Sequence, residues 1–103
     1  MRIKKGVRLD LLQPQMTPVM IAVERIWWVH GRDPTITSGN DGKHRSDSLH
    51  YQGLALDFRT KDLSDTLAIF FRDQLVSSLG ENYDVLLEFE PRHMHIEYDP
   101  DEV

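Results

Sequence analysis

The chain has 103 residues, of which 40% are hydrophobic and 28% are charged, a balance that predicts one folded domain over residues 1–103 and excludes disorder and a membrane span. Its 17 acidic and 12 basic residues give a net charge of -5, which argues against a nucleic-acid binder because such a protein must neutralise phosphates. The absence of cysteine excludes a disulfide framework and leaves His and carboxylate groups as the available metal ligands.

The first half of the chain predicts one helix, one strand and a polar loop. Thr17-Pro18 is typical of a capped helix start, and apolar residues at helical spacing predict a helix over about residues 18–30. The β-branched residues 35–37 favour a short strand, and the polar stretch 39–48 predicts an exposed loop.

The second half predicts a strand, a helix and two further strands. Large apolar residues alternate with small or polar ones over residues 54–59, which predicts a strand with Asp57 on the face opposite the large apolar side chains. Asp62 or Ser64 can cap a helix that Gly80 ends, and strands are expected at residues 84–89 and 93–98. We therefore expect an α+β fold, with two helices packed on a small, mainly antiparallel sheet.

The last predicted strand places three polar side chains, His93, His95 and Glu97, on one face. Burying such groups without partners costs about 1–3 kcal/mol each, whereas a bound cation would satisfy them. Exposure to water is the alternative, and a His-x-His strand alone leaves the two interpretations evenly balanced. The segment from His50 to Asp57 adds a histidine, a glycine turn and a strand carboxylate.

Four pieces of the sequence resemble, in order, the signature of the peptidase M15 group. They are Thr37-Ser38-Gly39, Ser48-Leu49-His50, Gly53-Leu54-Ala55-Leu56-Asp57 and Glu90-Pro91-Arg92-His93-Met94-His95. This group includes D-alanyl-D-alanine carboxypeptidases, dipeptidases and phage L-alanyl-D-glutamate endolysins, and it is related to the hedgehog zinc fold. The resemblance covers residues 35–99, and the joint pattern is far more specific than any single piece.

The resemblance implies a zinc ion (Zn2+) held by His50, Asp57 and His95, with a fourth coordination position open to water. It also implies a base beside the metal, for which Glu90 is the first candidate. Glu90 lies three residues before His93 rather than before His95, so His93 is expected to assist or to take the proton itself.

By the same resemblance, Ser48 contacts the substrate, and Arg45 or His44 holds its carboxylate or polarises its carbonyl. The implied substrate is a peptidoglycan stem peptide, and the implied protein is a monomeric phage or prophage lysis enzyme. The N-terminal segment lacks the continuous apolar stretch of a signal peptide, so we expect synthesis in the cytoplasm and action at the cell wall. A different class stays open: a catalytically silent zinc-binding module that binds a peptide or protein partner.

Overall fold

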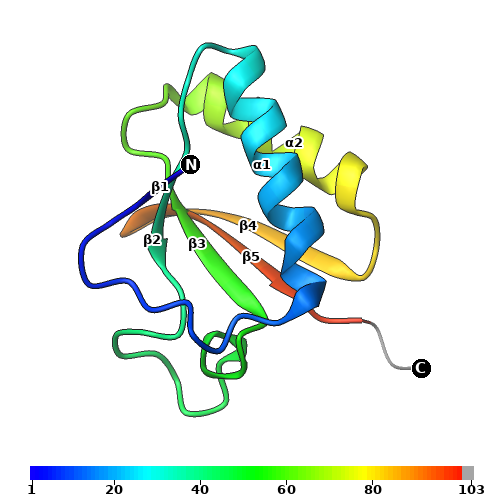
Figure 1. The fold of residues 1–103 in the computed structure, drawn as a ribbon. Helices are drawn as coiled ribbons and strands as arrows, with labels where there is room; N and C mark the ends of the chain where they lie inside the picture. Colours follow the sequence, from blue (N-terminus) through cyan, green and yellow to red (C-terminus); the bar gives the residue numbers. More distant parts are fainter. Residues whose placement is uncertain (101–103) are drawn as a thin grey trace.

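The computed structural model describes residues 1–100 and places two helices against one face of a five-stranded sheet (Figure 1). The sheet order is β1-β2-β3-β5-β4, with only β1 and β2 pairing in parallel. The strands are β1 (Arg2–Ile3), β2 (Thr35–Ser38), β3 (Ala55–Arg59), β4 (Tyr83–Phe89) and β5 (Arg92–Tyr98). The prediction of an α+β fold with a mainly antiparallel sheet is confirmed. No helix within residues 1–100 has the length and apolar character needed to cross a membrane.

The two helices are α1 (Thr17–Val29) and α2 (Asp65–Leu79), and each buries one apolar stripe against the sheet. The start of α1 differs from the prediction. Its N-cap is Met16, which makes no side-chain cap, because a 3₁₀ helix over Pro14–Met16 runs directly into α1 and takes Thr17 into the first turn. The predicted N-cap role of Thr17 is therefore wrong.

The ends of α2 follow the expected chemistry. The Ser64 hydroxyl accepts a hydrogen bond from the backbone N–H of Leu67 at 3.1 Å, so Ser64 rather than Asp62 is the N-cap. Gly80 stands at the C-terminal end, with a φ of 81° that favours glycine. This helix lies over the sheet and helps to close the core.

The two faces of the sheet differ in character. Leu56, Phe58, Met94 and Ile96 point toward the helices and are fully buried. Asp57 points to the other face, as the alternation predicted. The helices leave this second face open (Figure 1). Polar side chains of β3, β4 and β5 lie on it, among them Asp57, Glu88 and His95.

A long connection between β2 and β3 folds beside the open face. It contains a 3₁₀ helix over Leu49–Gln52 that the sequence did not predict, and this helix ends at Gly53. Gly53 has a φ of 72°, and a Cβ atom there would overlap with the carbonyl oxygen of Leu11. Gly39 is equally confined, because a Cβ atom there would overlap with the carbonyl oxygen of Arg8. The two glycines therefore let the N-terminal segment pack tightly against the connection.

Candidate metal centre

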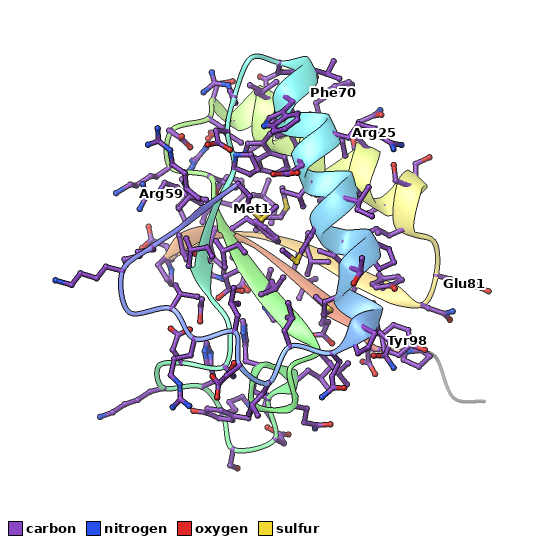
Figure 2. All side chains as sticks on the ribbon, in the orientation of Figure 1. Met1, Arg25, Arg59, Phe70, Glu81 and Tyr98 are labelled. Atoms are coloured by element: carbon purple, nitrogen blue, oxygen red, sulfur yellow. The ribbon has the colours of Figure 1, made fainter. Side chains whose placement is uncertain are left out.

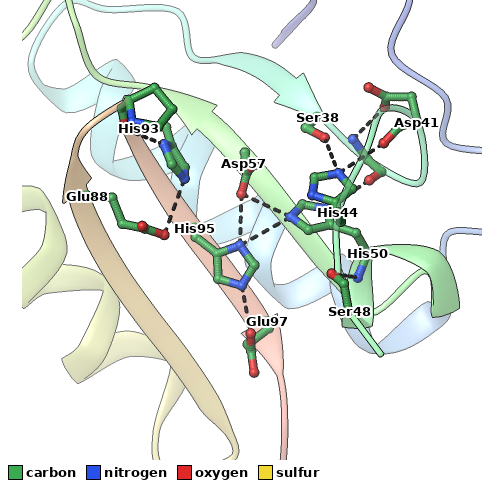
Figure 3. A network of polar contacts seen from close by, with 12 residues as sticks. Ser38, Asp41, His44, Ser48, His50, Asp57, Glu88, His93, His95 and Glu97 are labelled. Atoms are coloured by element: carbon green, nitrogen blue, oxygen red, sulfur yellow. Dashed lines mark hydrogen bonds and ion pairs between the residues drawn. The ribbon is translucent and has the colours of Figure 1, made fainter. Parts of the chain in front are cut away.

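Three predicted ligands meet at the open face of the sheet (Figure 3). Asp57 and His95 lie directly opposite one another in β3 and β5, and the 3₁₀ helix brings His50 to them. His50 Nε2 is 3.2 Å from Asp57 Oδ1 and 3.2 Å from His95 Nδ1, and His95 Nδ1 is 2.9 Å from the same Asp57 oxygen. These atoms could together hold a metal ion, although they come from segments up to 45 residues apart.

The imidazole of His50 is fixed in one orientation and one tautomer. Its backbone N–H donates to the Ser48 hydroxyl at 3.2 Å, which starts the 3₁₀ helix. Its Nδ1 lies 2.8 Å from the carbonyl oxygen of Gly39, which can only accept, so Nδ1 carries the hydrogen. In the neutral ring, Nε2 is then left as a bare lone pair directed at Asp57 and His95.

A second imidazole supports His50 from the side. The ring of His44 stacks on it with centroids 4.0 Å apart and planes 9° apart. His44 Nε2 lies between the Ser38 hydroxyl at 3.1 Å and the Asp41 carbonyl at 3.0 Å. Burial and the neighbouring His50 lower the pKa of His44, which favours a neutral ring. His44 is therefore a positioning residue for His50.

His95 is oriented by a carboxylate of its own strand. Its Nε2 donates to Glu97 Oε1 at 2.7 Å, which directs Nδ1 toward Asp57 and His50. The side chains of His95 and Glu97 are only 13% and 19% exposed, so water screens this contact little. His50 and His95 thus each direct one ring nitrogen at the centre and donate a hydrogen bond from the other to an acceptor.

The centre attracts positive charge. Burial of the Asp57 carboxyl favours its neutral form. Hydrogen bonds and charge interactions with the imidazoles of His50 and His95 outweigh burial and hold the pKa of Asp57 well below its usual range. Burial opposes a charged imidazole at His95, yet hydrogen bonds with Asp57 and Glu97 outweigh this and raise the pKa of His95 to about 9. A proton on His95 Nδ1 therefore satisfies the centre when no metal is bound, and a metal ion would have to displace it.

The centre opens into a cleft of about 870 Å³. The cleft lining includes Ser48, His44 and Arg45 from the loop, as well as His93 from β5. Arg45 is 87% exposed and pairs with Asp47 at 3.3 Å. The loop residues predicted to bind substrate are thus at the cleft, but their substrate contacts stay a prediction.

The two candidates for the base occupy different places. Glu90 is exposed on the turn between β4 and β5 and does not line the cleft. His93 lines the cleft, with Nδ1 donating to the Pro91 carbonyl at 2.6 Å and Nε2 at 3.4 Å from Glu88 Oε1. The structure therefore lends no support to Glu90 as the base.

The sequence did not predict the positioning roles of three groups in this site. The Gly39 carbonyl orients His50, Glu97 orients His95, and Glu88 faces His93. Glu97 was detectable, because it shares a strand face with both histidines. The other two depend on chain packing and strand register, which no local pattern reveals.

Comparison with known proteins finds no family model and no curated protein that matches this chain. The resemblance to the M15 peptidases consequently rests on the four sequence pieces alone.

Proposed function

We propose that this protein is a zinc-dependent peptidase that cleaves bacterial cell-wall peptides at a D-Ala-D-Ala or an L-Ala-D-Glu bond. The observation that carries the proposal is the convergence of His50 Nε2, Asp57 Oδ1 and His95 Nδ1 at the floor of an open cleft. The reaction and the substrate come from the sequence resemblance to the M15 peptidases.

The spacing of the three donor atoms supports zinc. Ligands placed tetrahedrally around zinc at about 2.0–2.1 Å are about 3.3 Å apart. The three separations in the site are 3.2, 3.2 and 2.9 Å, so a small outward shift of the three donor atoms suffices to accept the ion. Two imidazoles and one carboxylate are also a ligand set typical of catalytic zinc, which keeps one position free.

Peptide hydrolysis adds water to the scissile carbonyl and moves a proton to the departing amine. Bound zinc supplies Lewis acidity, which polarises a carbonyl and acidifies water. The chain itself must supply the group that carries the proton, and His93 is the imidazole that lines the cleft beside the ligands. Glu88, at 3.4 Å from His93 Nε2, would stabilise the ring while it is charged.

The silent zinc module has one observation in its favour. Both ring nitrogens of His93 already have neighbours, the Pro91 carbonyl and Glu88, and Glu90 stands outside the cleft. Catalysis therefore requires Nε2 of His93 to exchange Glu88 for water or substrate. Glu88 is 48% exposed, so this exchange needs no burial of its carboxylate.

Zinc content and peptide cleavage test the proposal together. Wild type is stripped with chelator, reloaded with zinc and incubated with purified peptidoglycan, and new amino and carboxyl termini are quantified. We expect one zinc per chain and zinc-dependent cleavage, both lost in His50→Ala. The control is His30→Ala, because His30 is exposed at the end of α1, hydrogen-bonds to the Ile26 carbonyl and lies outside the cleft lining.

Two further variants locate the proton carrier. His93→Gln should keep zinc and lose at least about a hundredfold in kcat, whereas Glu90→Gln should keep both. The reverse pattern would restore Glu90 as the base. Zinc binding without cleavage in wild type would favour the silent module, and a protein that binds no zinc would overturn both proposals.

A further inference from the structure

We propose that a basic pocket beside the metal centre, lined by Lys4, Arg59 and Lys61, binds a substrate carboxylate on the residue next to the scissile bond. This inference rests on the proposed peptidase function and names the chemical class of its substrate. It also moves the carboxylate site from the loop, where the resemblance implied Arg45 or His44, to the pocket that contains Arg59.

The basic pocket is continuous with the cleft. It has a volume of about 280 Å³ and shares Asp57, Pro91 and His93 with the cleft lining. A ligand that occupies the metal centre can therefore extend into this pocket without leaving the open face of the sheet.

The charges in the pocket are available for a ligand. Lys4, Arg59 and Lys61 form no ion pair with any residue from 1 to 100, although the chain as a whole carries a net charge of -5. The fourth cation of the lining, Arg92, is engaged instead, by Asp65 at 2.7 Å and by backbone carbonyls. Three uncompensated positive charges around one hollow favour an anion.

The register of the sheet sets the distance from the metal centre. Arg59 lies two residues beyond Asp57 on the same face of β3, which corresponds to about 7 Å along the strand, and it stands opposite His93. Figure 2 shows Arg59 extending outward from the end of β3. A guanidinium at this distance can hold a carboxylate one residue away from a carbonyl at the metal centre, with two parallel hydrogen bonds.

The rest of the cleft is less suited to a carboxylate. Glu97 and Asp99 line the cleft, and together with Asp84 they bring three carboxylates within 4.8 Å of one another, which would repel an anion. On the loop side, Arg45 is paired with Asp47 and His44 has its nitrogen engaged. Among these surfaces, the basic pocket thus offers a substrate carboxylate the most favourable electrostatic binding.

The test compares two pairs of peptides, and the members of each pair differ only at this carboxylate. Zinc-loaded wild type is assayed on N-acetyl-D-alanyl-D-alanine and on its C-terminal amide, and on N-acetyl-L-alanyl-D-glutamate and its α-carboxamide. We expect the KM of the cleaved acid to be at least about tenfold below that of its amide. Arg59→Gln and Lys61→Gln should each raise the KM of the acid toward that of its amide and so reduce or remove this preference. Lys5→Gln is the matched control, because Lys5 lies next to Lys4 in the chain and outside the pocket lining.

Each outcome decides one proposal. Equal KM values for acid and amide in wild type would refute the carboxylate site and leave the peptidase function standing. Loss of the preference in Arg45→Gln but not in Arg59→Gln would return the site to the loop. If wild type cleaves none of the peptides, the peptidase function fails. Titration of the same zinc-loaded protein with the intact peptides then tests the pocket directly, since Arg59→Gln must weaken binding of the acids alone.

Discussion

The hydrogen bond between Glu97 and His95 gives a quantitative test of the metal centre. It is 2.7 Å long, involves a carboxylate and is largely shielded from water. Removing such an outer partner of a metal-binding histidine typically lowers metal affinity by about 10- to 100-fold. Glu97→Gln keeps a carbonyl acceptor of similar shape, so we expect a loss of about tenfold, or about 1.4 kcal/mol. Glu97→Ala leaves His95 Nε2–H without that partner and should approach the upper value.

The assay is competition for zinc with a chromophoric chelator at constant pH. Asp84→Asn is the control, because it removes a carboxylate close to that of Glu97 without removing a contact to His95. Its zinc affinity should stay within about twofold of wild type. An unchanged affinity in Glu97→Gln would refute the orienting role of Glu97. An equal loss in Asp84→Asn would show that negative charge alone, and not the hydrogen bond, governs affinity.

Three further predictions concern stability. Gly53→Ala should lower the free energy of unfolding in urea by well over 2 kcal/mol, because it adds a clash with Leu11 to an unfavourable φ, whereas Gly31→Ala, with φ 70° and open space, should cost only about 1 kcal/mol. In zinc-free protein, the pKa of His95 is raised to about 9, so its contribution to stability is complete below about pH 6.5 and is lost as the pH rises through 9. Chemical denaturation at pH 7 and pH 10 should show this loss without zinc, and saturating zinc should abolish it. Ser64→Ala should cost about 1 kcal/mol through its cap while zinc affinity stays unchanged; a larger loss of zinc than of stability would contradict this separation.

The main elements of the fold were predictable because each has a strong local signal. Helix α2 has a serine cap and a terminal glycine, and β3 alternates strictly around Asp57. Strand β1 was missed because Arg2–Ile3 is too short to show a period and is held only by pairing with β2. The 3₁₀ helix over Leu49–Gln52 was missed because its stability depends on Ser48 and on the packing of Gly53 against the N-terminal segment.

The sequence by itself determined the ligand types, their order and the strand faces on which Asp57 and His95 lie, since these follow from side-chain chemistry and the two-residue period of a strand. Only the tertiary structure decided that these two residues stand opposite one another and that His50 directs its Nε2 lone pair at them. It also decided that Glu90 does not line the cleft and that Arg59 lines a pocket beside it. The physical reason is that strand register and loop packing arise from contacts between distant segments, which no local sequence pattern encodes.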